Sequence, residues 1–551
     1  MKIIVEEYGY DLELISAILS ERFYVTLQNN RCKVNYIGYY FDTDRHESVM
    51  ILPKVFIENG KVFGQFKPEE IFDLDKSPNA REALRKSGKL EFLFSITTWL
   101  YLAIRQFQKR SQANTITESS DLANVVSTLG DHDITELDLI QSLLRFSREN
   151  QTLFTFIKKT NSTQNQQVSW AKTIAKTLPI LHKGSPVYIN TITNQKAVNY
   201  DEELLLILSS VLSHFNQKYH LQIHINPLFA PYKNQELANL MEKGTTILKQ
   251  IKYKYFSDKL LKLWHLLYAF FARIDKIKHQ KHYKEILLVR DFNLVFEDMI
   301  DNLLAEPNLP QHLKVHKDGK EIDHIYPYQD LLTNQDFIYH IGDSKYYKDD
   351  SQTGINAIAK QYTYAKNVIQ YNVDVLNENK PLPNQIRYRD ELTEGYNITP
   401  NFFISAVVND TFNFEEEGLI FKNNFKQNRH FKDRLFDRDT LILQTYNINF
   451  LYVINSYVVN SQTKKDKFKA SARALFREKI VSFLDRKYCF YEVIPDESLS
   501  DFISGNFKNL TGKMYRPSGW ENKILVAFER ENLADVPIFD GAKVCAYSIV
   551  A

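Results

Sequence analysis

The spacing of hydrophobic and polar positions divides the chain into stretches with different periodicities. Between residues 31 and 66 short apolar runs are broken by turns, which predicts strands at 34–41, 48–57 and 61–66. From residue 78 to residue 284 apolar positions recur at helical spacing, most clearly at 90–109. The pattern therefore predicts a small β-rich module followed by a mainly helical region.

Beyond residue 284 the pattern alternates between the two periods. It predicts helices at 287–304 and 356–371, and strands at 313–317, 321–326, 337–345, 402–408 and 449–454. Such alternation is typical of an α/β layered core with a mixed sheet. A basic helix at 467–487 and a strand at 488–494 then predict an appended C-terminal module.

The length of 551 residues requires several domains, because a single core rarely grows past about 250 to 300 residues. We expect a multidomain α+β protein with four units. These are a β-rich N-terminal module, a mainly helical region, an α/β core and a C-terminal module, at residues 1–80, 81–285, 286–460 and 461–551.

Composition and charge narrow the class of protein. The 69 Lys and Arg nearly cancel the 67 Asp and Glu, and the net charge of +2 gives no global attraction to nucleic acid or membranes. Any such affinity must be local. Cys32, Cys489 and Cys545 lie far apart, which excludes a disulfide framework and fits a reducing cytoplasm.

We also expect neither secretion nor membrane insertion. Acidic residues stand near the N-terminus, where a signal peptide needs an apolar stretch. The longest apolar run, 92–104, is shorter than the roughly 20 residues of a spanning helix. The sequence therefore predicts a cytoplasmic protein.

Two adjacent predicted strands carry two carboxylates and a lysine. Asp323 lies in the first strand, and Asp343 and Lys345 end the second. Strand alternation turns Asp343 and Lys345 to one face, with Ser344 on the other. We expect Asp323 and Asp343 to converge beside Lys345, although an ordinary surface salt bridge is the alternative interpretation.

This combination suits phosphodiester hydrolysis. Carboxylates hold Mg²⁺, with Mn²⁺ as a second choice of metal, and Lys345 supplies a cation near the attacking water. Glu297, on the preceding helix, is a further metal-ligand candidate or an ordinary solvated carboxylate. Gln361, with Tyr362 and Tyr364 on the following helix, either points into the same pocket or only packs.

The order of these residues along the chain resembles the PD-(D/E)xK nuclease pattern. A helix carries Glu297, and then come Asp323, Asp343-x-Lys345 and Gln361-Tyr362-x-Tyr364. No proline precedes Asp323, where Ile322 stands instead. The resemblance implies that 286–460 form a restriction-endonuclease-like core. It also implies that Asp323, Asp343 and Glu297 bind metal, while Lys345 and Gln361 complete the catalytic set.

Flanking segments resemble more specific families. Tyr36-Ile37-Gly38-Tyr39 and Ile51-Leu52-Pro53-Lys54-Val55 are similar to the N-terminal module of McrC-like nuclease subunits. Segments 431–440 and 449–453 resemble the LlaJI restriction endonuclease family. The resemblance implies an endonuclease that cuts double-stranded DNA in a restriction or anti-phage defence system, together with a McrB-like GTPase or ATPase.

The chain contains no Gly-x-x-x-x-Gly-Lys-Ser/Thr loop, so the resemblance assigns the motor to a separate subunit that docks on the N-terminal module. A homo-oligomer and a hetero-complex both remain open, as do site-specific and modified-base-dependent cutting.

The rival interpretation is a non-catalytic adaptor with a PD-(D/E)xK-like fold, which binds DNA or regulates a partner NTPase. The basic helix near residue 473 either binds phosphates or docks as an amphipathic helix.

Overall fold

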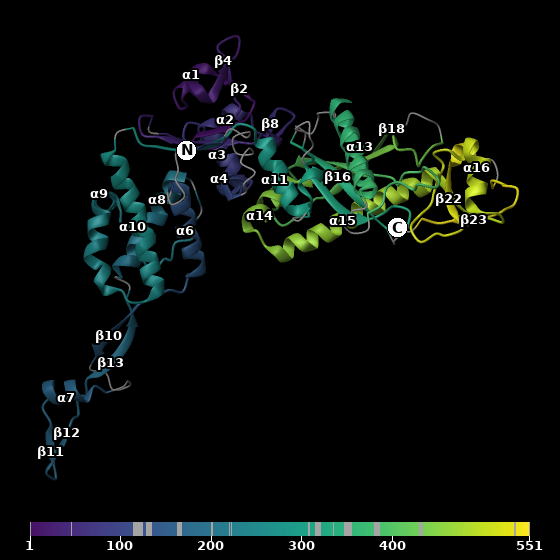
Figure 1. The fold of residues 1–551 in the computed structure, drawn as a ribbon. Helices are drawn as coiled ribbons and strands as arrows, with labels where there is room; N and C mark the ends of the chain where they lie inside the picture. The colour runs from purple at the N-terminus through teal and green to yellow at the C-terminus, as the bar shows by residue number, and fades with distance from the viewer. Residues whose placement is uncertain are drawn as a thin grey trace.

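The computed structural model describes residues 2–45, 47–113, 125–127, 135–161, 168–199, 202–219, 221, 223–280, 282–306, 309–314, 321–333, 336–346, 355–378, 386–428, 433–533 and 536–549. Figure 1 shows an elongated molecule. The N-terminal module lies between a helical bundle on one side and the α/β core on the other, and the C-terminal sheet lies at the far end of that core. The chain is therefore a mixed α+β protein with several sheets.

The N-terminal module is built on a five-stranded sheet. Its strand order is β1 (Lys2–Val5), β6 (Glu47–Leu52), β5 (Ile37–Asp42), β14 (Lys284–Val289) and β9 (Val125–Ser127). This sheet thus draws strands from beyond residue 80. Gly38 has a φ of +131°, and a Cβ there would lie 2.2 Å from the Leu287 carbonyl oxygen. Only glycine allows β5 and β14 to approach in this way.

Smaller elements complete this module. A three-stranded sheet has the order β2 (Gly9–Asp11), β4 (Arg31–Val34) and β3 (Tyr24–Thr26). A hairpin joins β7 (Ile57–Glu58) to β8 (Lys61–Val62). The helices are α1 (Leu12–Ser16), η1 (Glu21–Phe23), η2 (Lys54–Phe56), α2 (Pro68–Phe72) and α3 (Pro78–Lys86).

Long helices form the bundle beside this sheet, as the periodicity predicts. They are α4 (Lys89–Ala113), α6 (Glu136–Glu149), α8 (Glu203–Tyr219), α9 (Asn234–Ile251) and α10 (Asp258–His279), with η3 (Lys252–Lys254) between the last two. Their apolar faces share one core with the N-terminal sheet. The helical region and the sheet therefore pack as one body.

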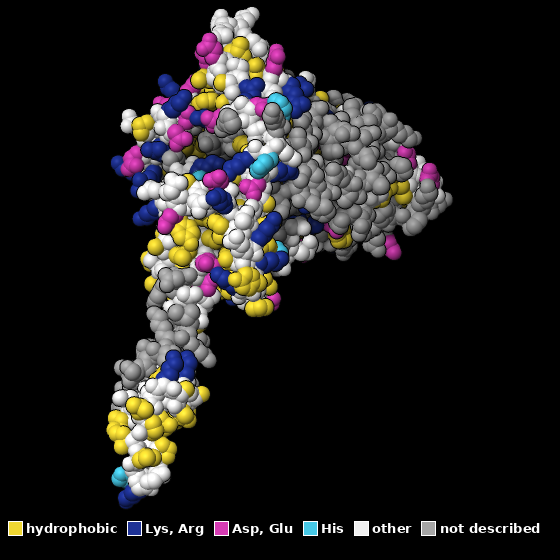
Figure 2. Space-filling view, turned by 90° about the vertical axis from the view of Figure 1, so that its left-hand side faces the viewer, with side chains coloured by type: hydrophobic (Ala, Val, Ile, Leu, Met, Phe, Trp, Pro, Cys, Tyr) yellow, Lys and Arg dark blue, Asp and Glu magenta, His cyan; other side chains and the backbone are white. Residues whose placement is uncertain are grey.

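A narrow stalk extends from the bundle (Figure 1). It consists of the ribbon β10 (Phe156–Asn161) and β13 (Thr193–Val198), followed by α7 (Trp170–Lys176) and the hairpin of β11 (Ile180–His182) and β12 (Ser185–Val187). Figure 2 shows hydrophobic side chains gathered toward its far end, where Leu178 is 94% exposed and Leu181 74%. An exposed apolar patch of this kind is typical of an interaction surface.

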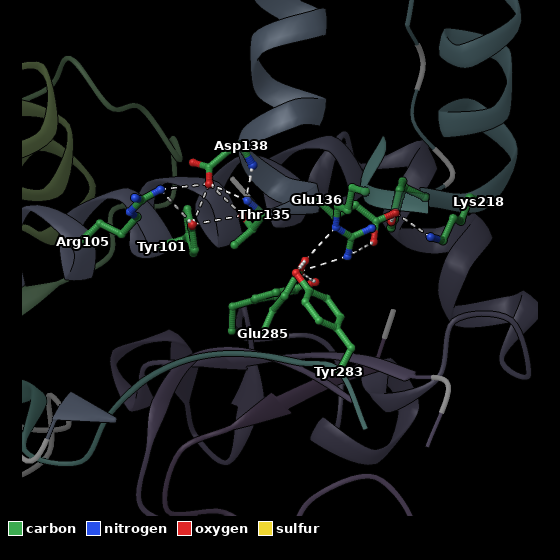
Figure 3. A network of polar contacts seen from close by, with 11 residues as sticks. Tyr101, Arg105, Thr135, Glu136, Asp138, Lys218, Tyr283 and Glu285 are labelled. Atoms are coloured by element: carbon green, nitrogen blue, oxygen red, sulfur yellow. Dashed lines mark hydrogen bonds and ion pairs between the residues drawn. The ribbon is translucent and has the colours of Figure 1, made fainter. Parts of the chain in front are cut away.

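A buried ionic network ties the bundle to the sheet (Figure 3). Arg273 of α10 binds Glu285 of β14 through Nε and Oε1 at 2.7 Å, and its Nη2 lies 3.4 Å from Glu136 Oε2 of α6. Lys218 Nζ and the Tyr219 hydroxyl, both of α8, also contact Glu136 Oε1, at 2.6 and 2.5 Å. Each buried charge thus has an opposite partner, as burial requires.

The α/β core is a five-stranded mixed sheet. Its order is β15 (His324–Gln329), β16 (Phe337–Lys345), β17 (Pro400–Val407), β19 (Leu441–Asn449) and β18 (Ile420–Asn428). The two outer pairs are antiparallel, and β17 runs parallel to both of its neighbours. Helix α13 (Ile355–Asn377) connects β16 to the parallel strand β17.

Helices cover both faces of this sheet. Phe402 of β17 and Tyr446 of β19 pack on Phe476, in a cluster that also contains α11 (Phe292–Leu304) and α14 (Phe450–Val459). On the other face Ile341 of β16 packs in a cluster with Val368 of α13. The strand β16 therefore lies between two helical layers.

Three sequence predictions are wrong. The predicted helix 287–304 is a strand, β14, up to Val289 and a helix only from Phe292; the predicted strand 449–454 falls mostly in helix α14. A strand was also expected at 313–317, but residues 313 and 314 are the last two of α12 (Gln311–Lys314), and 315–317 lie outside the described residues. Leu287 and residues 450–454 are fully or almost fully buried, and an apolar run of this kind shows no diagnostic period.

The C-terminal part begins with α15 (Gln462–Lys487). It continues in a sheet of order β21 (Met514–Tyr515), β22 (Ile524–Glu529), β20 (Tyr488–Pro495) and β23 (Ala542–Tyr547), with α16 (Leu499–Leu510) and η5 (Arg530–Asn532). Arg473 and Arg477 of α15 are buried and donate to the backbone oxygens of Leu304 and Asp330. This favours the docked-helix interpretation for these two arginines.

No described helix is both long and apolar enough to cross a membrane.

Candidate functional site

Strand β16 carries the centre of the site. Its nine residues coincide with the strand predicted at 337–345. Lys345 Nζ contacts Asp343 Oδ2, and Asp343 is 1% exposed and Lys345 9%. The two side chains therefore lie together in a buried environment, unlike an ordinary salt bridge on the surface.

Ser344 lies on the opposite face of β16, as strand alternation requires. Its hydroxyl is 2.5 Å from Nε2 of His324, and Nδ1 of this buried histidine is 3.3 Å from Asp301 Oδ1 of α11. These hydrogen bonds join the end of β16 to the start of β15 on the face of the sheet opposite Asp343. His324 is thus a satisfied structural group.

Asp323 lies directly before β15, which begins at His324 and not at residue 321 as predicted. The first pair of the antiparallel ladder joins His324 to Gly342, which brings Asp323 close to the Asp343 carboxylate. The backbone N–H of Ser344 donates to Asp323 Oδ2 at 3.1 Å. Burial, together with the charges of Asp343 and Glu297, raises the pKa of Asp323 well above its usual value.

Glu297, on helix α11, interacts electrostatically with Asp343. Burial and the negative charge of Asp343 raise the pKa of Glu297 to about 7, although Lys360 and Lys345 act in the opposite direction. Its neighbours Asp298 and Asp301 have other partners, Arg110 and Lys314. Glu297 therefore differs from the adjacent helix carboxylates.

Helix α13 lies against this face of β16. Gln361 is fully buried, and neither its amide nitrogen nor its amide oxygen has a hydrogen-bond partner among the described residues. A buried primary amide without a partner is costly and rare. Within the described residues, the Gln361 amide is therefore available to bind a ligand that the structure does not contain.

Sequence reasoning missed one charged residue, Lys360. Its Nζ lies 5.3 Å from the centroid of the Tyr364 ring. Burial lowers the pKa of Lys360, but the charge of Asp323 and the bond with Tyr364 outweigh this effect and raise it. The sequence could have indicated Lys360, because it directly precedes Gln361 and lies one helical turn before Tyr364.

The donor set fits a hard divalent cation. Among the described residues no three or more His, Cys, Asp or Glu side chains are placed to hold a metal ion. Mg²⁺, however, keeps several waters and binds through only one or two carboxylates. Asp323 and Asp343 can supply these, and burial, together with the charges of Asp343 and Glu297, raises the pKa of Asp323.

A family model and a solved structure match this chain. A family model described as LlaJI restriction endonuclease matches residues 85–414. No curated protein sequence matches the chain. Among solved structures, a chain of the complex of Thermococcus gammatolerans McrB AAA+ hexamers with bound McrC is similar at 11% identity and a TM-score of 0.27, covering 87% of this chain and 99% of that one.

Proposed function

The chain belongs to the LlaJI restriction endonuclease family, and we propose that it is a metal-dependent DNA endonuclease that hydrolyses phosphodiester bonds in a restriction or anti-phage defence system. The observation that carries this proposal is the juxtaposition of Asp323, Asp343 and Lys345 at the ends of β15 and β16. Glu297 and Gln361, on the flanking helices α11 and α13, support it. They follow the order that the PD-(D/E)xK resemblance implies.

Each residue has a defined role in this proposal. Asp323 and Asp343 hold Mg²⁺ or Mn²⁺, and Glu297 completes the ligand set. The ion, when bound, polarises the phosphate and lowers the pKa of the attacking water. Lys345 places a positive charge beside the developing phosphorane, and Gln361 orients water or a phosphate oxygen through its buried amide.

Double-stranded DNA and a McrB-like GTPase or ATPase are the proposed partners. The sequence carries no nucleotide-binding loop of its own, and the segment around Lys54 resembles the N-terminal module of McrC-like subunits. The exposed apolar side chains at the end of the stalk, such as Leu178 and Leu181, form a second surface suited to a protein partner.

Plasmid cleavage tests the proposed activity. Wild type, Lys345→Ala and Lys523→Ala are incubated with plasmid and Mg²⁺, with and without the partner NTPase and nucleotide. Lys523, which pairs with Glu492 in the C-terminal sheet, is the matched lysine control. We expect cutting by wild type and Lys523→Ala and its loss in Lys345→Ala; cutting by Lys345→Ala at the wild-type rate contradicts the proposal.

A second candidate function is a non-catalytic adaptor that binds DNA or regulates the NTPase. It is favoured by the lack of a three-ligand metal group among the described residues. The complete set of Asp323, Asp343 and Lys345 argues against it, because a chain that no longer cuts DNA does not need to keep every member of the set. Absence of cutting in every mixture, together with altered NTPase activity, supports the adaptor.

A further inference from the structure

Tyr346 links the proposed active site to the N-terminal module. It directly follows Lys345 at the end of β16 and is 4% exposed. Its hydroxyl donates to Glu6 Oε2 at 2.8 Å. Glu6 follows strand β1, so this hydrogen bond joins residues 340 positions apart in the sequence.

Glu6 is held in place by the segment that follows β6. The Lys54 backbone N–H donates to the same Glu6 oxygen at 3.2 Å, and Glu6 is 5% exposed. Lys54 Nζ binds Glu7 Oε1 at 2.9 Å and lies 5.3 Å from the centroid of the Tyr346 ring. The two modules therefore meet through a buried polar contact around one tyrosine.

The ring of Tyr346 also packs on the helix that carries Glu297. Its centroid lies 5.3 Å from that of Phe292 and 6.2 Å from that of Phe296, both on α11. Phe450 of α14 joins this cluster and contacts Phe56 of η2 at 5.9 Å. Tyr346 thus touches the strand of Lys345, the helix of Glu297 and the N-terminal module.

We propose that Tyr346 is a positioning residue, through which the N-terminal module sets the place of the Lys345 ammonium and thereby controls DNA cleavage. This inference rests on the proposed nuclease function and deepens it. A displacement of about 1 Å at a catalytic group can cost on the order of 100-fold in rate. A partner docked beside Lys54 would act on the Glu6–Tyr346 bond directly.

Single-turnover cleavage at saturating DNA tests this role. Tyr346→Phe removes only the hydroxyl, and we expect the rate constant to fall on the order of 10-fold or more, with DNA affinity and melting temperature near those of wild type. Glu6→Leu should have the same effect. Glu6→Gln should retain most activity, because its amide oxygen still accepts from Tyr346.

Tyr40→Phe is the matched control. The Tyr40 hydroxyl donates to Asp42 Oδ2 at 2.9 Å inside the N-terminal sheet and is far from Lys345 in the chain. A rate for Tyr346→Phe within twofold of wild type, or a loss shared by Tyr40→Phe, would overturn the inference. So would a loss explained by weaker DNA binding or a lower melting temperature.

Asp343→Ala separates this inference from the proposed function. If wild type cuts, Asp343→Ala does not and Tyr346→Phe cuts normally, only the positioning role fails. If wild type does not cut in any mixture, or Asp343→Ala cuts at the wild-type rate, the nuclease function fails and the inference fails with it.

Discussion

The ammonium group of Lys345 contacts Asp343 Oδ2, two residues earlier on the same strand. Strand alternation brings the two side chains to one face, and Asp323, just before β15, interacts with Asp343. The carboxylates outnumber the nearby lysines once Glu297 is included, and burial raises the pKa of Asp323 and of Glu297. This arrangement favours a bound cation.

Asp343→Asn should abolish cleavage without unfolding the protein. The amide keeps the shape of the side chain but loses the charge that binds a cation. We expect the cleavage rate to fall on the order of 100-fold or more. The melting temperature in metal-free buffer should change little, because the loss of the Lys345 ion pair opposes the relief of repulsion with Asp323. Plasmid cleavage and thermal unfolding measure the two effects.

Asp439→Asn is the matched control for that variant, since Asp439 pairs with Lys366 at 2.7 Å on the α13 side of the core. It should leave cleavage within twofold of wild type. An Asp343→Asn protein that cuts normally would remove Asp343 from the proposed metal site.

Added Mg²⁺ should stabilise the wild type. A ligand that binds only the folded state raises its stability by RT ln(1 + [L]/Kd), which is about 2.7 kcal/mol at 100 times the Kd. The melting temperature should therefore rise with Mg²⁺ and fall back with EDTA. In Asp323→Asn/Asp343→Asn the Mg²⁺-dependent rise should disappear, and an equal rise in both proteins would place the metal elsewhere.

Gly342→Ala should destabilise the end of β16. A Cβ at this position would lie 2.1 Å from Cε2 of the Phe402 ring, so the ring or the strand must move. Overpacking of this kind costs about 1–3 kcal/mol. Urea unfolding should show this loss, and cleavage should fall with it because Asp343 is the next residue.

Gly505→Ala provides the contrast, because a Cβ on this residue of α16 meets no atom within 4 Å. Helix propensity should make this variant about 0.5–1 kcal/mol more stable than wild type. Equal stability losses in both glycine variants would contradict the packing argument.

Stability should fall in acid through Glu136. Burial raises the pKa of Glu136, but Arg273 and Lys218 outweigh it and lower the pKa to about 2. A carboxylate with a lowered folded pKa stabilises the protein above its unfolded pKa of about 4.5, and this contribution is lost as pH falls toward 2. The contribution is about 3 kcal/mol.

Unfolding of Glu136→Gln as a function of pH tests this. Its stability should be lower at pH 7 and vary less between pH 4.5 and 2 than that of wild type. Glu149→Gln, on the same helix but in an exposed pair with Arg145, should follow the wild-type curve. Identical curves for all three proteins would contradict a role of the buried network.

Charged substitutions at the end of the stalk should weaken binding of the proposed partner. Leu178→Asp and Leu181→Asp place charges on side chains that are 94% and 74% exposed, so folding should be unaffected. Association with the NTPase, measured by co-purification or light scattering, should fall at least 10-fold if this apolar surface is buried in the complex. Unchanged association would exclude the stalk end from the interface.

Local sequence patterns were enough to predict some elements of the core. The alternation at 337–345 predicted strand β16, and the helical period at 356–371 predicted most of α13. Residues two apart on a strand share a face, so the Asp343–Lys345 contact also followed from local rules. Such periodicities depend only on the geometry of the chain.

The contacts between distant segments depend on the tertiary structure. The apolar runs at Leu287 and Phe450 gave no distinct period, and their strand and helix states depend on burial from all sides. Lys360 enters the site only because α13 packs on β16, and the Glu6–Tyr346 bond exists only because the N-terminal module docks on the core. Long-range packing sets these contacts, because their energy depends on neighbours that no local pattern specifies.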